Sequence, residues 1–148
     1  MKKQTQKPIQ YQHGYCEFYK LKFFLTPDSL IPRPERELLV DEILKIKPTT
    51  LLDLGTGSGN IAIAVAKNLP DVKILATDVS EKALEVAHKN AKFHYVEGQI
   101  FFEVRDLLEG MQKAPDIIVT NLPYIPTARL LYIDPMVTEW ELLIRRGG

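Results

Sequence analysis

The order of hydrophobic and polar positions along the chain predicts alternating strands and helices. Short apolar runs predict buried strands at 49–54, 72–78, 99–104 and 115–120. Apolar residues at helical spacing predict helices at 59–70 and 80–93, and Ser80 is expected to cap the second one. Strands that alternate with helices of this length pair in parallel through right-handed crossovers. The pattern therefore predicts an α/β fold with a doubly wound parallel sheet.

Two further elements are predicted before this alternating part. Residues 1–12 are mostly polar, and we expect them to be loose apart from Pro8, Ile9 and Tyr11, which could begin an ordered segment. Residues 15–30 are rich in aromatic and β-branched residues and are interrupted by Pro27, which is typical of a small β-hairpin. A helix is expected from Pro34, because proline suits a first helical turn, and Pro48 ends it. The chain thus begins with a tail and a hairpin that precede the main sheet.

Composition excludes several classes of function. The 148 residues, 45% of them hydrophobic, suit one globular unit. Nineteen basic residues balance nineteen acidic ones, which argues against nucleic acid and against an anionic membrane as partners. The longest aliphatic run, 61–66, is far shorter than the about 20 residues that span a bilayer. We therefore expect a protein that has no membrane segment.

The cysteine and histidine content of the chain indicates a reducing compartment and gives no sign of a metal site. Cys16 is the single cysteine, so no internal disulfide can form, and a cytoplasmic location fits best. The three histidines have neither metal-ligand spacing nor a partner nucleophile. We expect surface or hairpin positions for His13, His88 and His94.

A glycine-rich motif, DLGTGSGN at residues 53–60, lies between the first strand and the first helix of the alternating part. Ligands of open parallel sheets bind at the carboxyl ends of the strands. Glycines there let the backbone approach a ligand closely, and the helix that follows offers free N–H groups. A dinucleotide fingerprint would place a third glycine at position 60, where the chain has Asn60. The motif instead reads D-x-G-x-G-x-G.

This form of the loop resembles the S-adenosyl-L-methionine loop of class I methyltransferases. The cofactor carries an ammonium and a carboxylate, for which the Asp53 carboxylate and backbone groups are suitable partners. Asp78, at the end of the second strand, is placed to accept hydrogen bonds from ribose hydroxyls. The alternative is that the glycines only make a tight turn and Asp78 caps a helix. The candidate cofactor-binding residues are Asp53, Gly55, Thr56, Gly57, Gly59, Asn60, Asp78, Val79, Asp106 and Asn121.

Within this set, Asp106 depends on the resemblance alone. The resemblance places Asp106 beside the adenine, where a carboxylate can accept the exocyclic amino group. Many relatives have glycine before this aspartate, whereas this chain has Arg105. A capping role is the alternative for Asp106.

The stretch NLPY, residues 121–124, leaves the carboxyl end of the fourth predicted strand. Methyltransferases that act on planar nitrogen, in amides or adenine amino groups, carry a motif of this kind. Such a nitrogen is a poor nucleophile, so it must be held in line with the methyl group. The Asn121 side-chain oxygen and the Leu122 carbonyl oxygen can accept its two hydrogens. Pro123 stiffens the turn and Tyr124 can stack on the planar group; the alternative is a strand-ending turn with a packed tyrosine.

Residues 8–148 resemble the HemK-type protein-glutamine methyltransferases, which modify the glutamine of the Gly-Gly-Gln loop in peptide chain release factors. The most specific match is LIPRPERELLV at residues 30–40, because adenine-specific methyltransferases generally lack it. The resemblance places this segment at the border of the substrate pocket. Arg33, Pro34 and Glu35 are therefore candidate substrate-binding residues, with helix capping and a surface ion pair as the alternative.

Two departures from the family pattern keep other functions open. The family usually has N-P-P-Y, whereas N-L-P-Y is common in ribosomal RNA adenine dimethyltransferases, and Glu139-Trp140 replaces the usual glutamate-proline pair. One alternative is thus an adenine amino-group methyltransferase that acts on RNA or DNA, although the neutral charge and the absence of a basic cluster in the sequence argue against it. Another is an inactive cofactor-binding or interaction fragment.

The resemblance also implies a Rossmann-like sheet of seven strands in the order 3-2-1-4-5-7-6, preceded by a helical domain. We expect this chain to supply only the first four strands and to be truncated at both ends. It would consist of a tail and hairpin at 1–30 and a partial methyltransferase domain at 31–148, with the part after Ala128 helical in its middle. The fourth strand would be an uncovered edge, through which the chain could associate with itself.

Overall fold

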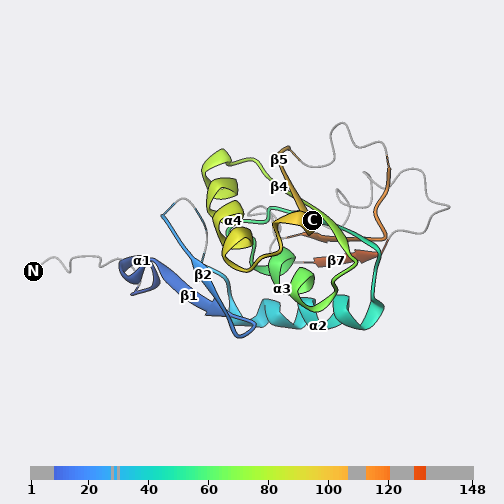
Figure 1. Ribbon diagram of the computed structural model, residues 1–148, viewed down its shortest axis with the longest axis horizontal. Coiled ribbons are helices and arrows are strands. Elements are labelled where there is room, and N and C mark those ends of the chain that lie inside the picture. Colours follow the sequence, from blue (N-terminus) through green and yellow to red (C-terminus); the bar gives the residue numbers. More distant parts are fainter. Residues whose placement is uncertain (1–8, 28, 30, 107–112, 121–128, 133–148) are drawn as a thin grey trace, which may run out of the picture.

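The computed structural model describes residues 9–27, 29, 31–106, 113–120 and 129–132 (Figure 1). The helices are α1 (Ile9–His13), η1 (Pro34–Arg36), α2 (Glu37–Ile46), α3 (Asn60–Asn68), α4 (Glu81–Phe93) and η2 (Glu97–Gln99), of which η1 and η2 are short 3-10 turns. The strands are β1 (Tyr15–Phe18), β2 (Leu21–Phe24), β3 (Thr50–Leu54), β4 (Lys73–Asp78), β5 (Ile100–Val104), β6 (Ile117–Thr120) and β7 (Arg129–Tyr132). The predicted hairpin, the four predicted parallel strands and the helices predicted from Pro34, at 59–70 and at 80–93 are confirmed, whereas α1 shows that the end of the tail, expected to be loose apart from Ile9 and Tyr11, is helical.

The main sheet has five strands in the order β5-β4-β3-β6-β7. Strand β3 lies parallel to β4 and to β6, and β5 lies parallel to β4. In chain order these four strands occupy the positions 3-2-1-4 that the family resemblance implies. The α/β fold with an incomplete parallel sheet is therefore confirmed.

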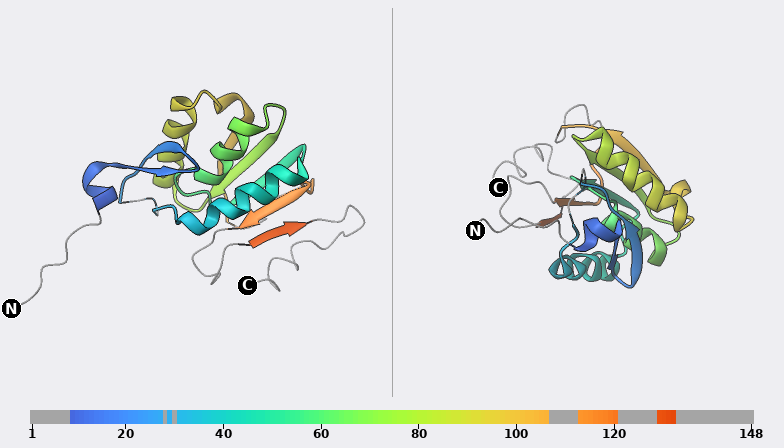
Figure 2. Two further views of the ribbon diagram at one scale, coloured as in Figure 1. Left: turned by 90° about the horizontal axis from the view of Figure 1, so that it is seen from below. Right: turned by 90° about the vertical axis from the view of Figure 1, so that its left-hand side faces the viewer.

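The prediction that the fourth strand is uncovered is wrong. Strand β7 pairs antiparallel with β6, from the Ile117–Tyr132 pair to the Thr120–Arg129 pair, and the two lie side by side in Figure 2. After Arg129 the stretch RLLY has two leucines and a tyrosine, a composition that suits a strand beside an apolar neighbour. The edge of β6 is thus covered within the chain, and self-association through it loses its basis. The chain from Arg129 begins as a strand, and the residues beyond Tyr132, where a helix is expected, lie outside the described ranges.

The starts of β3 and β6 are joined by Asp116. Its Oδ2 accepts hydrogen bonds from the Thr49 amide at 2.9 Å and from the Thr49 hydroxyl at 2.8 Å, and its own amide donates to the Thr50 hydroxyl at 2.9 Å. The hydrogen bond from the Thr49 hydroxyl is the main reason that the pKa of Asp116 is lowered. These bonds reinforce the parallel register of the two strands.

Helices α2, α3 and α4 pack together with the hairpin on one face of the sheet (Figure 2). Because strand side chains alternate between faces, every second strand residue points into this core. Fully buried members of the core include Phe18, Phe23, Val40, Ile43, Leu51, Ile63, Val65, Ile117 and Val119. The hairpin therefore shares one hydrophobic core with the sheet.

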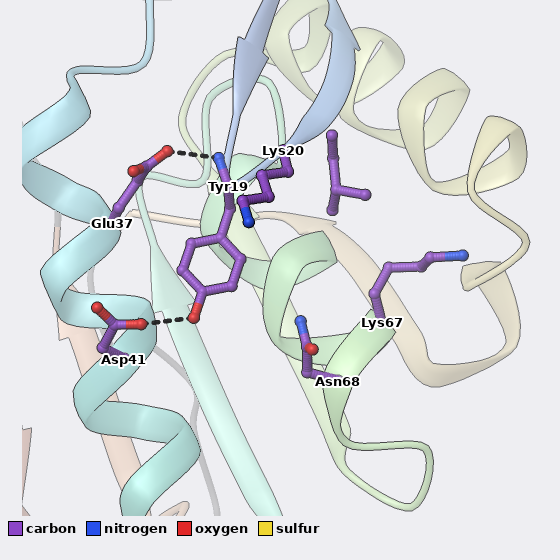
Figure 3. Close-up of a pocket in the computed structure, with 7 residues that line it drawn as sticks. Tyr19, Lys20, Glu37, Asp41, Lys67 and Asn68 are labelled. Atoms are coloured by element: carbon purple, nitrogen blue, oxygen red, sulfur yellow. Dashed lines mark hydrogen bonds between the residues drawn. The ribbon is translucent and has the colours of Figure 1, made fainter.

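The tip of the hairpin is anchored on α2 beside an open pocket (Figure 3). Tyr19 and Lys20 form the turn with positive φ values of 52° and 61°, which matches the twist of a two-residue hairpin. The Tyr19 amide donates to Glu37 at 2.6 Å, and its hydroxyl donates to Asp41 at 2.5 Å. The bond to Asp41, followed by burial, raises the pKa of Tyr19 to about 12. Asn68, the last residue of α3, also lines this pocket. The glycine-rich loop precedes the first residue of α3, so the pocket lies at the opposite end of the helix from the loop.

A single buried amide, that of Asn90, joins the hairpin, α4 and the glycine-rich loop. The residue is 0% exposed. Its Oδ1 accepts from the Phe24 amide at 2.7 Å, and its Nδ2 donates to the Phe24 carbonyl at 3.1 Å and to the Ser58 carbonyl at 2.8 Å. The Ser58 bond is buried and the two Phe24 bonds are partly buried, so loss of Asn90 would leave these backbone groups poorly satisfied.

The expected surface position of His94 is wrong, since this residue is only 8% exposed. Its Nε2 lies 2.6 Å from the Lys22 carbonyl oxygen, and its ring centroid is 5.5 Å from that of Phe23. His94 follows the last turn of α4, where the hairpin covers it. His94 is buried by a segment that is distant in sequence. The spacing of histidines along the chain, on which the prediction is based, does not report such packing.

Replacement of Asn90 by alanine is expected to lower the free energy of unfolding by about 2–4 kcal/mol, because it leaves buried backbone groups of Phe24 and Ser58 without partners. Asn68→Ala is the matched control, since Asn68 is exposed and donates only to the Ala64 carbonyl at 2.8 Å. Its expected loss is below about 1 kcal/mol. Urea unfolding followed by circular dichroism measures both. Equal losses in the two variants would contradict the role of Asn90.

Candidate functional site

The glycine-rich loop connects β3 to α3 at the carboxyl end of the parallel strands. Gly55, Gly57 and Gly59 have φ values of 73°, 58° and 83°, a region that glycine adopts without strain. A Cβ at Gly59 would lie 2.9 Å from Ile63 Cδ1 and 3.2 Å from Ala87 Cβ, so a side chain there would push α3 away from α4. A Cβ at Gly57 would meet no atom within 4 Å. The loop thus packs closely at Gly59 and leaves open space at Gly57.

Hydrogen bonds to β4 hold the loop in place. The amides of Gly55 and Thr56 both donate to the Thr77 carbonyl at 2.9 Å. The Gly57 amide donates to Asp78 Oδ2 at 3.0 Å. These bonds fix the loop against the end of the neighbouring parallel strand.

Asp78 retains acceptor capacity beside the loop. Its Oδ1 accepts from the Ser80 amide at 3.0 Å, so each carboxylate oxygen has one hydrogen bond and can accept a second. Ser80, as predicted, is the N-cap of α4, and its hydroxyl accepts from the Ala83 amide at 3.1 Å. The alternative in which Asp78 caps the helix is therefore not needed.

Asp53 is a buried carboxyl group, 1% exposed, at the end of β3. Its Oδ2 accepts from the Thr56 hydroxyl at 2.8 Å, whereas its Oδ1 has no hydrogen-bond partner within the described ranges. Burial raises the pKa of Asp53 to about 7, the Thr56 hydroxyl and the Ala62 amide oppose this rise, and the charge of Asp78 adds to it. A buried carboxyl group with an unpartnered oxygen is suited to receive a cationic hydrogen-bond donor.

Further unpartnered polar atoms gather around the same loop. Among the described residues, buried atoms without a hydrogen-bond partner include Ser58 Oγ, Asn60 Nδ2 and Thr77 Oγ1. Native structures leave few such atoms, and each usually has a ligand, a water or a functional reason. Their concentration around one loop therefore indicates a site for a polar ligand.

The structure also brings Val79 and Asp106 to this edge of the sheet. Val79 follows Asp78 directly and is 63% exposed. The Arg105 amide donates to the Asp78 carbonyl at 3.1 Å, so the exposed Asp106 comes next to the end of β4. An exposed apolar side chain and an exposed carboxylate thus lie on neighbouring strand ends.

The substrate-binding candidates are placed only in part. Arg33, Pro34 and Glu35 are exposed around the start of η1, and the Arg33 side chain forms no capping hydrogen bond there. Neither charged residue forms an ion pair with another described residue. Arg33 is the N-cap residue of η1 by position and Glu35 lies in its first turn, so the alternative role at the helix start stays open beside the substrate-binding prediction. Asn121, Leu122, Pro123 and Tyr124 lie outside the described residues.

Thr77 and Asn90 support the site but are absent from the sequence prediction. Thr77 holds the loop through its backbone carbonyl, and every residue type has such a group, so the sequence does not indicate this contact. Asn90 lies on the apolar stripe of α4 together with Ala83, Ala87 and Ala91. A polar residue on such a stripe is the signal that could have indicated a buried amide.

The described part of the chain contains no group of acidic, histidine and cysteine side chains that could hold a metal ion. Nor do these residues include a helix with the length and apolarity needed to cross a membrane.

Comparison with known proteins relates this site to methyltransferases. Residues 35–139 match the family model of the methyltransferase small domain. A release factor glutamine methyltransferase of Bacteroides thetaiotaomicron is 45% identical over 143 residues, which are 93% of this chain and 51% of that protein. Its counterpart in Flavobacterium psychrophilum is 44% identical over 145 residues, 92% of this chain and 50% of that protein. The chain spans about half the length of the curated relatives it matches.

Solved structures show the same fold. The tRNA (uracil-54, C5)-methyltransferase of Pyrococcus abyssi, in complex with S-adenosyl-L-homocysteine, has a TM-score of 0.58 with 22% sequence identity. The match covers 71% of this chain and 27% of that one. At this identity the likeness concerns the fold alone, which is that of class I methyltransferases.

The raised pKa of Asp53 predicts that its ionisation opposes folding. Between about pH 4 and pH 7 this carboxyl group is protonated in the folded chain and ionised in the unfolded chain. The folded chain then binds more protons, so the contribution of Asp53 to stability falls as the pH rises through this window. The free energy of unfolding of Asp53→Asn should therefore rise relative to that of the parent chain between pH 5 and pH 7, by at most about 1.4 kcal/mol per pH unit.

Unfolding in urea at pH 5, 6, 7 and 8 measures this difference. Asp71→Asn is the matched control, because Asp71 is an exposed carboxylate outside the site. A stability difference between Asp53→Asn and the parent chain that does not change with pH would contradict the assignment.

Proposed function

This chain belongs to the methyltransferase small domain family, and we propose that, like the release factor glutamine methyltransferases that it resembles, it transfers a methyl group from S-adenosyl-L-methionine to a glutamine side-chain amide in a peptide chain release factor. The observation that carries the proposal is the polar cluster at the carboxyl ends of β3 and β4. Its charges and unpartnered atoms complement the polar groups of this cofactor.

Asp53 and the start of α3 would hold the methionine end of the cofactor. An ammonium group beside Asp53 supplies the hydrogen bond that Oδ1 lacks and stabilises the ionised carboxylate. The cofactor carboxylate suits the Nδ2 of Asn60 at the start of α3, which has no hydrogen-bond partner among the described residues. The open space at Gly57 lets the chain approach the ligand without a steric conflict.

Asp78, Val79 and Asp106 would hold the nucleoside end. The free lone pairs of the Asp78 carboxylate accept the two ribose hydroxyl groups. The exposed Val79 side chain offers an apolar surface to the adenine ring. Asp106, on the adjoining strand end, accepts the exocyclic amino group.

The methyl acceptor would bind at the 121–124 motif. This placement is supported by Thr120, the last residue of β6, which is paired in parallel with Leu54, the residue before the glycine-rich loop. Asn121 and the Leu122 carbonyl accept the amide hydrogens and hold the nitrogen in line with the methyl group. Tyr124 stacks on the amide, and Pro123 restricts the turn. The exposed Arg33, Pro34 and Glu35 would border this pocket.

A methyl-transfer assay with labelled cofactor tests the proposal on a release factor and on RNA in parallel. Label is expected on the release factor. Asn121→Ala should lower kcat by about 10²–10³-fold, because the nitrogen is no longer oriented and polarised. Asn68→Ala, at the far end of α3, is the control and should retain the parent rate.

Two results would overturn the proposal. Transfer to RNA alone would favour an adenine methyltransferase, the alternative that the NLPY form raises. Transfer to neither substrate would favour a non-catalytic cofactor-binding fragment.

Cofactor binding is expected to release protons near pH 7. The Asp53 carboxyl group, with a pKa of about 7, is partly protonated in the free chain and becomes fully ionised beside the ammonium group. Calorimetric titration at pH 7 in two buffers of different ionisation enthalpy should show release of about half a proton per bound cofactor. Asp53→Asn should abolish the difference between buffers. Equal heats in both buffers for the parent chain would contradict the role of Asp53.

A further inference from the structure

The outward face of the hairpin carries aromatic and lysine side chains that the proposed reaction does not use. Tyr15 and Phe24 are cross-strand partners and point away from the core, as does Lys22. Lys89 of α4 continues the set, and the Phe93 ring centroid lies 5.1 Å from that of Phe24. We name these five side chains the lysine–aromatic face.

The two lysines of this face rest on the rings. Lys22 Nζ lies 4.5 Å from the centroid of the Tyr15 ring and 5.3 Å from that of Phe24. Lys89 Nζ lies 4.4 Å from the centroid of the Phe24 ring. Such cation–π contacts restrict the long lysine side chains and present their charges at fixed positions.

The face is open to a partner. Tyr15 is 45% exposed and Phe93 is 48% exposed, and Lys22 and Lys89 are both on the surface. Neither lysine forms an ion pair with another described residue. Glu17 is the cross-strand partner of Lys22, yet the Lys22 ammonium lies over the rings. Two ammonium groups are therefore available to the anions of a partner.

The geometry favours carboxylates over nucleic-acid bases. Proteins that bind single strands stack bases on open aromatic faces inside a positively charged groove. Here lysine ammonium groups lie over the rings of Tyr15 and Phe24, so one face of each ring is already occupied. A segment with acidic side chains can pair with these ammonium groups while its apolar parts contact the exposed aromatic side chains.

Backbone contacts tie the face to the site of methyl transfer. Asn90 bonds both backbone groups of Phe24 and also the Ser58 carbonyl of the glycine-rich loop. The Lys22 carbonyl contacts the buried His94 ring at 2.6 Å. A partner that docks on the face is thus held at a fixed position relative to the glycine-rich loop.

We propose that the lysine–aromatic face is a docking surface for an acidic segment of the protein whose glutamine is methylated. The inference rests on the proposed function and identifies where the substrate protein is recognised away from the reacting amide. Docking there increases the affinity of the chain for the whole substrate protein, and the two lysine charges increase the rate of association. The face takes no part in methyl transfer itself.

The double variant Lys22→Gln, Lys89→Gln tests the proposal, because it removes two charges and retains much of the side-chain length. The Kd of the chain for an intact release factor should rise about tenfold, and its dependence on salt should weaken. Lys45→Gln, Lys73→Gln makes the same charge change at exposed positions of α2 and β4 and should leave the Kd unchanged. Circular dichroism and urea unfolding verify that both variants fold.

Kinetics with two substrates separate docking from chemistry. For the intact release factor, KM should rise in the double variant while kcat stays unchanged. For a short peptide that contains Gly-Gly-Gln, both constants should stay at the parent values, because the peptide lacks the acidic segment. Binding of S-adenosyl-L-methionine should also be unaffected.

Several outcomes would overturn the docking surface. These are no binding of the release factor by the parent chain, an unchanged Kd in the double variant, or an equal loss in the control variant. Loss of single-stranded RNA binding in place of release factor binding would identify a nucleic-acid surface instead. By contrast, release factor binding that depends on the two lysines without any methyl transfer would contradict the proposed function and support the docking surface.

Discussion

The parallel register of β3 with β4 and β6 is the constraint on which the site depends. Leu54 is paired with Thr77 on one side and with Thr120 on the other. The glycine-rich loop follows Leu54 and Asp78 follows Thr77, so both lie at the same edge of the sheet, and the 121–124 motif comes directly after Thr120 in the sequence. Asp116 reinforces the register at the opposite edge, where it joins β3 and β6. A shift of one residue in either pairing would separate the proposed cofactor and substrate groups.

Several polar groups at this edge are buried in a way that favours ligand binding and lowers the stability of the folded chain. Asp53 is buried with an unpartnered oxygen and a raised pKa, which is a net cost to the folded chain at neutral pH. Perturbed carboxyl groups of this kind are common at functional sites, because a bound cation removes the cost. The glycine-rich loop is meanwhile fixed by Thr77, Asp78 and Asn90, so binding requires little reorganisation of the backbone.

Local signals made the parallel strands, the Ser80 cap and the glycine-rich loop predictable, because each depends on residues close in sequence. Interactions between distant segments were not predictable. The pairing of β7 with β6, the burial of His94 and the amide contacts of Asn90 each require the fold to be known. The lysine–aromatic face combines β1, β2 and α4, so its lysines do not form a cluster in the sequence. The sequence therefore indicated the chemistry of the candidate site more fully than the surface around it.

Mass spectrometry of an intact release factor, after incubation with this chain and S-adenosyl-L-methionine that carries a deuterated methyl group, tests whether the chain methylates glutamine. Fragment ions locate the transferred group on a single residue. We expect one deuterated methyl group on the glutamine of the Gly-Gly-Gln loop. A release factor that remains unlabelled, or that carries the label at another residue, would contradict this expectation.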